Sequence, residues 1–193
     1  ASVFYHPEIA RVWFIDSDCI MKPECIKLLK VEGDIVSCPV PIMKRDGDGV
    51  MYPITSMYVY SDESNDGEKP IFVPLQIPGE AVQEIDGCGM SMTLISRKVI
   101  LDERMWLSNR DEDYLGKTKT LEHILFRHSY NPDGSMSLGE DLDFCHRARK
   151  LGYRIMVDTS ARPGHLKEMD LLEVQKAISA YGAIVKGDGV VAI

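Results

Sequence analysis

The sequence predicts an α/β fold within a single domain that spans residues 1–193. Short runs of apolar, β-branched and aromatic residues alternate with stretches whose apolar residues recur at helical spacing. Such alternation is typical of a sheet covered by helices. The composition also indicates a globular chain, because 45% of the residues are hydrophobic and 27% are charged. A chain of this length buries roughly 70% of its unfolded surface.

The first predicted elements are a strand, a helix and a second strand. Residues 11–15 read Arg-Val-Trp-Phe-Ile, a pattern that favours a short buried strand. Pro23 is suited to the first turn of a helix over residues 24–30. Three apolar residues of that helix are available for burial: Ile26, Leu28 and Leu29. The next strand is expected over residues 34–40.

The middle of the chain has the composition of a hairpin region followed by a strand and a helix. Residues 41–78 are rich in glycine, proline and aspartate, with alternating tyrosine, methionine and valine, which indicates a hairpin and loops. A strand over residues 90–95 then leads into a short helix over residues 97–101. Residues 104–139 carry many charges, so we expect a long loop there, with one helix near residues 120–128.

The last part of the chain contains the clearest helix signal. Residues 140–151 place apolar side chains at a spacing of three: Leu142, Cys145, Ala148 and Leu151. Gly152 follows as a stop signal. A turn precedes this helix at residues 131–134, which read Asn-Pro-Asp-Gly. A strand over residues 153–157 and a helix over residues 170–181 complete the prediction.

Charge and cysteine usage exclude several classes of protein. The net charge of −8 argues against a broad basic face for nucleic acid or an anionic membrane. No apolar run approaches the roughly 18 residues of a transmembrane helix, and the first residues do not read as a signal peptide. Five scattered cysteines form no CxxC pair: Cys19, Cys25, Cys38, Cys88 and Cys145. We therefore expect reduced, mostly packed thiols in a cytoplasmic protein.

Two groups of carboxylates are candidates for chemistry. Asp16 and Asp18 directly follow the first strand, and side chains two apart on an extended segment point the same way. Two such oxygen donors suit Mg²⁺ or Mn²⁺ held together with substrate phosphates, although they can equally cap the next helix. Glu140, Asp141 and Asp143 begin a helix, where the dipole alone can explain them. The functional alternative is that one of them acts as a general base.

Two further features complete the set of candidates. Gly87 and Gly89 flank Cys88 and permit close approach of a ligand or, equally, a β-bulge. His165 follows a predicted strand, where a histidine is a capping residue or a metal ligand.

In this order the motifs resemble the second half of a family 2 type glycosyltransferase of the GT-A fold, over residues 11–166. The residues that carry the resemblance are Val-Trp-Phe-Ile-Asp-Ser-Asp at 12–18, Asp-Gly-Cys-Gly-Met at 86–90 and Gly-Glu-Asp-Leu-Asp-Phe at 139–144, followed by Arg147 and, after four further residues, Gly-Tyr-Arg-Ile at 152–155. The resemblance implies a mixed sheet flanked by helices. It also implies transfer of a sugar from a nucleotide-diphospho-sugar to an acceptor hydroxyl, with inversion.

The resemblance also implies a role for each candidate residue. Asp16, Asp18 and His165 match the site that binds Mn²⁺ or Mg²⁺, with Asp18 as the direct ligand. Asp141, with Glu140 beside it, matches the catalytic base. Their closeness raises the pKa of a carboxyl, which favours a base. The segment Gly87-Cys88-Gly89 matches the residues that lie under the donor sugar and the acceptor.

The sequence departs from the family at two places. Only ten residues precede Arg11, whereas family members carry their nucleoside-binding elements before this strand. We therefore expect a piece of a longer protein, a shortened form, or a homo-oligomer or partner chain that supplies the missing elements. The usual Gly-x-Phe-Asp-Glu stretch is also absent, and Trp106 lies in that region. We expect it to offer a stacking face to a sugar.

Two other functions are compatible with the sequence. Haloacid-dehalogenase-like phosphatases also place Asp-x-Asp after an early strand, but they expect Thr or Val at the position of Ile20. The other alternative is a sugar- or nucleotide-binding module that has lost catalysis.

Overall fold

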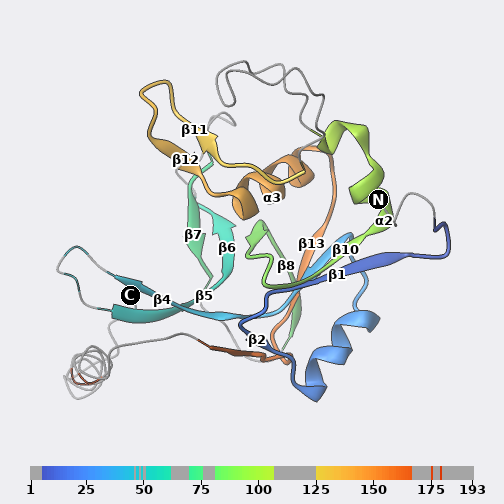
Figure 1. Cartoon of the computed structure of the whole chain (residues 1–193), viewed down its shortest axis with the longest axis horizontal. Helices are drawn as coiled ribbons and strands as arrows, with labels where there is room; N and C mark the ends of the chain where they lie inside the picture. Colours follow the sequence, from blue (N-terminus) through green and yellow to red (C-terminus); the bar gives the residue numbers. More distant parts are fainter. Residues whose placement is uncertain are drawn as a thin grey trace.

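A computed structural model of the chain describes residues 6–45, 47, 49, 51–61, 70–75, 81–106, 125–166, 175 and 179. It is a mixed α/β structure with a mixed sheet and few helices among these residues (Figure 1). The strands are β1 (Arg11–Ile15), β2 (Cys19–Ile20), β3 (Ile35–Ser37), β4 (Pro41–Arg45), β5 (Met51–Thr55), β6 (Met57–Tyr60), β7 (Phe72–Pro74), β8 (Val82–Ile85), β9 (Gly87–Cys88), β10 (Met92–Ser96), β11 (Ser129–Tyr130), β12 (Met136–Leu138), β13 (Ile155–Asp158) and β14 (Gly164–His165). The helices are η1 (Pro23–Lys30), α2 (Arg97–Leu101), η2 (Glu103–Met105) and α3 (Glu140–Lys150).

The central sheet has five strands in the order β1-β10-β3-β13-β8. Strands β3 and β13 are parallel, whereas the other neighbouring pairs are antiparallel. Strands β1, β3 and β13 therefore run in the same direction and end at the same edge of the sheet. Because β10 runs the opposite way, it begins at that edge, directly opposite the end of β1. This arrangement brings the segments after β1 and before β10 together.

Both faces of the sheet are buried, as consecutive residues of its strands show. In β3, Ile35 packs in one core cluster and Val36 in another, and Ile155 and Met156 of β13 divide in the same way. Helix α3 supplies Phe144 and other residues to the first cluster, while η1 covers the second. Figure 1 shows α3 and η1 on opposite sides of the sheet. The α/β class predicted from the sequence is confirmed.

The first helix differs from the prediction in its type and in the face it buries. Segment η1 is a 3₁₀ helix with Pro23 at its start, so its side chains repeat every three residues. The buried positions are therefore Cys25, Leu28 and Val31, three residues apart. Ile26 and Leu29 are 54% and 52% exposed, so their expected burial is wrong.

The predicted hairpin region contains the antiparallel pair β4–β5 and the strands β6 and β7, which form a three-stranded sheet with the later strand β9. The loop predicted over residues 104–139 contains the end of η2 and the hairpin β11–β12. Its turn includes Gly134 at φ +81°, as the Asn-Pro-Asp-Gly signal indicated. Residues 125–128 are not helical, so that part of the predicted helix is wrong, and residues 120–124 lie outside the described residues.

Helix α3 confirms the clearest signal in the sequence. It ends at Lys150, and Gly152 follows with φ +83°, which is the left-handed conformation that glycine adopts readily after a helix. The helix predicted over residues 170–181 lies outside the described residues, apart from Gln175 and Ser179, which are helical. Among the described residues, no helix has both the length and the apolar character needed to cross a membrane.

Candidate metal and general-base site

The segment after β1, which carries the two predicted aspartates, forms a turn. The Cys19 amide donates to the Asp16 carbonyl at 3.0 Å, which closes a turn over residues 16–19. The extended backbone from which a common direction of Asp16 and Asp18 was predicted is therefore not present. Asp16 is exposed, and its amide donates to the carbonyl of Ser91 at 2.9 Å.

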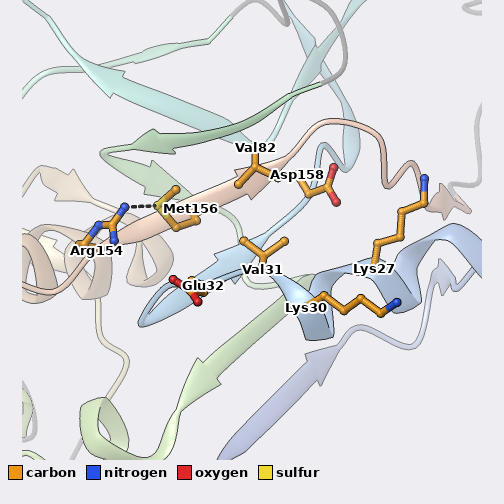
Figure 2. A pocket seen from close by; sticks show the side chains of 8 residues that line it. All are labelled: Lys27, Lys30, Val31, Glu32, Val82, Arg154, Met156 and Asp158. Carbon is orange, nitrogen blue, oxygen red and sulfur yellow. Dashed lines mark hydrogen bonds between the residues drawn. The ribbon is translucent and has the colours of Figure 1, made fainter.

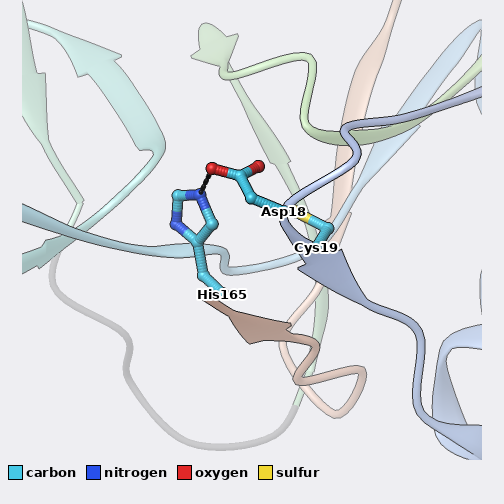
Figure 3. A group of neighbouring side chains, drawn as sticks. All are labelled: Asp18, Cys19 and His165. Carbon is cyan, nitrogen blue, oxygen red and sulfur yellow. Dashed lines mark hydrogen bonds and ion pairs between the residues drawn. The ribbon is translucent and has the colours of Figure 1, made fainter. Parts of the chain in front are cut away.

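Asp18 lies against His165, as the sequence predicted for a shared metal site. The Asp18 carboxylate Oδ2 is 3.2 Å from His165 Nε2 (Figure 3). The His165 side chain is 5% exposed and that of Asp18 is 35% exposed. His165 Nδ1 lies 2.7 Å from the carbonyl of Pro41, so it carries the proton, and Nε2 faces Asp18. A histidine fixed in this way through its other nitrogen is typical of metal ligands.

Cys19 joins this pair, although no spacing in the sequence pointed to it. Strand β2 pairs with β14 so that Cys19 stands directly opposite His165, and directly opposed residues of antiparallel strands share a face. Ligand atoms of Asp18, Cys19 and His165 all lie within 4.8 Å of one another. Within the described part of the chain, Asp16 is not a member of such a group.

The residues of the glycine motif have two different environments. Gly87 and Cys88 are packed against other residues, whereas Gly89 lies beside Asp141. A side chain at Gly87 would meet Phe72 at 2.8 Å and Leu142 at 2.9 Å, so this glycine lets α3 pack closely on β9. Cys88 is fully buried, and its amide donates to Cys145 Sγ at 3.4 Å. Protein atoms occupy the space that a ligand would need at these two residues. We therefore leave Gly87 and Cys88 out of the candidate site.

Gly89 and Met90 instead border Asp141. The Met90 amide donates to Asp141 Oδ2 at 3.1 Å, and a side chain at Gly89 would come within 3.6 Å of the same oxygen. Ser56 lies beside Gly89, and its hydroxyl is buried without a hydrogen-bond partner. A side chain at Gly89 would thus stand between Ser56 and the Asp141 carboxylate.

The environment of Asp141 raises its pKa from 3.8 to about 6. Burial is the main cause, because it disfavours the charged form, and the negative charges of Glu140 and Asp16 act in the same direction. The hydrogen bond from Met90 and the nearby His128 oppose the rise. The sequence predicted the contribution of Glu140, but the larger effect of burial needed the structure. A carboxylate with this pKa is suited to accept a proton near neutral pH.

The two other acidic residues of α3 lie beside basic side chains. Glu140 is half exposed and lies 3.0 Å from His128 Nδ1. Asp143 is buried and binds Arg147 at 2.8 Å. Arg147 also donates to the carbonyls of Met105 and Leu125, so it ties α3 to two other segments. Asp143 therefore has a structural role, and Asp141 is the carboxylate that fits a general base.

Trp106 packs against the first core cluster, and its indole nitrogen donates to the carbonyl of Ile100 at 2.6 Å. Since its polar edge and part of its ring are held by protein, we leave it out of the candidate site.

The structure has a hollow of about 480 Å³ elsewhere, between η1 and the strands β8 and β13 (Figure 2). Lys27, Lys30 and Arg154 line it, together with Met156 of the second core cluster. It therefore lies on the η1 face of the sheet, opposite the face that α3 covers. None of the predicted site residues lines this hollow.

Comparisons with known proteins give a distant structural likeness and no match in sequence. No protein-family model matches the sequence, and no curated protein matches it. Among solved structures, the crystal structure of A197 from STIV is similar, at 15% identity and a TM-score of 0.42, over 86% of this chain and 63% of that one. The chain thus spans less than two thirds of A197. A likeness this distant carries no inference about function.

Proposed function

We propose that this chain is a metal-dependent glycosyltransferase with a GT-A-like fold. It transfers a sugar from a nucleotide-diphospho-sugar to an acceptor hydroxyl with inversion. The observation that carries the proposal is the meeting of three distant segments at one sheet edge. The turn at residues 16–19 follows β1, Gly89 and Met90 precede β10, and Asp141 contacts Met90 from α3. These segments lie far apart in the sequence, so their contact is a product of the fold.

The residues at this edge divide into a cation site and a base. Asp18 and His165 would hold the divalent cation, Mn²⁺ or Mg²⁺, and the charge of Asp16 acts on Asp141. Their donor set fits such an ion, because a carboxylate oxygen and an oriented imidazole nitrogen lie 3.2 Å apart. The cation would neutralise the charge that develops on the departing diphosphate.

Asp141 would act as the general base in this reaction. Its raised pKa, about 6, keeps it ionised at neutral pH and still basic enough to take the proton of an attacking hydroxyl. The Met90 amide holds one carboxylate oxygen at 3.1 Å, which orients the side chain. Glu140 would act through its charge on Asp141 and not on the substrate directly.

Calorimetric titration tests the proposal with UDP, GDP and their sugar conjugates, with and without Mn²⁺. We expect one nucleotide to bind only when the metal is present, and Asp18→Asn to abolish that binding. Asp141→Asn should bind the donor normally but lose transfer by about 10²- to 10⁴-fold, the usual contribution of a general base. Glu103→Gln, an exposed substitution in η2, serves as the matched control and should change neither quantity.

Product analysis distinguishes the alternatives. Metal-dependent binding without turnover would favour a binding module that has lost catalysis. Release of inorganic phosphate from phosphomonoesters would favour a phosphatase of the haloacid-dehalogenase type. If a well-folded chain binds no nucleotide under any condition, the proposal as stated for this chain is wrong.

A further inference from the structure

Cys19 differs from the other cysteines in its position. Four of the five thiols are buried: Cys25, Cys38, Cys88 and Cys145. Cys19 is the one that retains partial exposure. The pairing of β2 with β14 sets it opposite His165, and the Asp18 carbonyl extends the pairing by accepting from the Leu166 amide at 2.8 Å. The backbone therefore holds Cys19, Asp18 and His165 in a defined relation to one another.

The three side chains supply one sulfur, one oxygen and one nitrogen. Mg²⁺ prefers oxygen ligands in octahedral geometry, so a thiolate suits it poorly. Zn²⁺ accepts cysteine sulfur, histidine nitrogen and aspartate oxygen, and three protein ligands with one open position are typical of its catalytic sites. The Pro41 carbonyl at 2.7 Å from His165 Nδ1 provides the outer contact that zinc-bound histidines usually make.

We propose that Asp18, Cys19 and His165 form a zinc-binding site in which Cys19 is a direct ligand. The site binds Zn²⁺ more tightly than Mn²⁺ or Mg²⁺, and its fourth position is open to an oxygen ligand. Zinc binding itself does not depend on the proposed transferase activity. If the chain is the proposed transferase, a diphosphate oxygen of the donor takes the open position, and this part of the proposal rests on that function.

Metal titration of the purified, metal-free chain tests the site directly. Co²⁺ serves as a spectroscopic probe, because a cysteine–cobalt bond gives a charge-transfer absorption band that oxygen and nitrogen ligands do not give. We expect this band in the unmodified chain, its removal by added Zn²⁺ and its absence in Cys19→Ser. The affinity for Zn²⁺ should fall at least about 10- to 100-fold in Cys19→Ser, since loss of an outer partner alone costs that much.

Three further variants make the result specific. His165→Gln should lose Zn²⁺ affinity to a similar extent. Cys19→Asp replaces sulfur with oxygen, so it should weaken Zn²⁺ binding and strengthen binding of Mn²⁺. His6→Gln alters an exposed histidine that pairs with Glu8, away from the site, and should leave Zn²⁺ affinity unchanged. Far-ultraviolet circular dichroism establishes that each variant is folded.

Alkylation of the unmodified chain provides a test that needs no variant. Cys19 should react with iodoacetamide faster than the four buried cysteines, and saturating Zn²⁺ should protect it. Unchanged alkylation in Zn²⁺, or a cobalt spectrum with no charge-transfer band, would overturn the zinc site. A zinc site without metal-dependent nucleotide binding would contradict only the proposed transferase, so the two failures are distinguishable.

Discussion

Asp141 carries a cost in stability that follows from its environment. Folding moves its carboxyl from water to a largely buried position, and its pKa rises from 3.8 to about 6. Below about pH 4 the group is protonated in both states and costs nothing. Above about pH 6 the group is ionised in both states, and its burial then lowers the free energy of unfolding by on the order of 2–3 kcal/mol. The free energy of unfolding should therefore fall as the pH rises through this interval.

Asp141→Asn should remove that cost in the metal-free chain. An amide oxygen can still accept the Met90 hydrogen bond, and it carries no charge to desolvate. We expect the substitution to raise the free energy of unfolding by about 1–3 kcal/mol at about pH 7.5 and to have little effect at about pH 4. Urea denaturation at the two pH values measures this. Equal effects at both would contradict a raised pKa, and Glu103→Gln should show no effect at either.

At the scale of elements, the close packing of α3 on β9 depends on Gly87. A side chain there would meet Phe72 and Leu142 at less than 3.0 Å, so Gly87→Ala should destabilise the fold by about 1–3 kcal/mol through overpacking. A side chain at Gly47 would meet nothing within 4 Å, so Gly47→Ala is the matched control. Thermal unfolding of both variants tests this, and equal melting temperatures would show that the helix can move away without loss.

The elements also show what the sequence can predict. The bounds of β1 and α2 agree with the predictions, and those of α3 agree to within one residue, because each is defined by local signals. The type of η1 is not predictable in this way, since a 3₁₀ helix and a short α-helix begin with the same proline signal. For a similar reason, the sequence does not decide between a turn and an extended backbone at Asp16 and Asp18, and the structure has the turn.

The candidate site is predictable in part. Motifs alone single out Asp18, His165 and Asp141, and the structure brings the first two together and largely buries the carboxyl of the third. Cys19 does not stand out in the sequence as a candidate ligand. Its place beside His165 depends on the register between β2 and β14, and Asp18 and His165 in these segments are 147 residues apart. Local pattern carries no information on such a register. The contacts of Gly87, Cys88 and Trp106 are those of packed residues, and their predicted binding role stays a prediction.

On the scale of the whole molecule, β1 forms one end of the central sheet as far as the described residues define it. Hydrogen bonds from Asp16 to Ser91 and from Arg97 to Ala10 show that the even-numbered residues of this strand bond to β10. The backbone groups of the odd-numbered residues, Ile15 among them, therefore point away from the sheet. An edge of this kind is a template for pairing with another strand. We expect the chain to self-associate through β1.

Ile15→Pro tests this expectation. Proline removes an outward-pointing amide, so the bonds to β10 remain while pairing along the outer edge is blocked. We expect sedimentation equilibrium to show association of the unmodified chain that weakens in Ile15→Pro. An unmodified chain that stays monomeric at every concentration would rule this out. Val82→Pro is a comparison at the opposite end of the sheet, because Val82 is also exposed in an outer strand, and it should leave association through β1 intact.

The pairing of β2 with β14 has a consequence for the stability of the fold. Only two residue pairs form this ladder, Gly164 with Ile20 and His165 with Cys19, yet it joins segments from near the two ends of the described core. A metal ion bound by both strands would link them reversibly, and it would bind the folded chain but not the unfolded chain. At a free concentration of about 100 times its dissociation constant, such an ion adds about 2.7 kcal/mol to stability. Resistance to heat and to proteases would then rise with the concentration of free metal. A chelator would lower the stability of the fold by weakening this one strand pair.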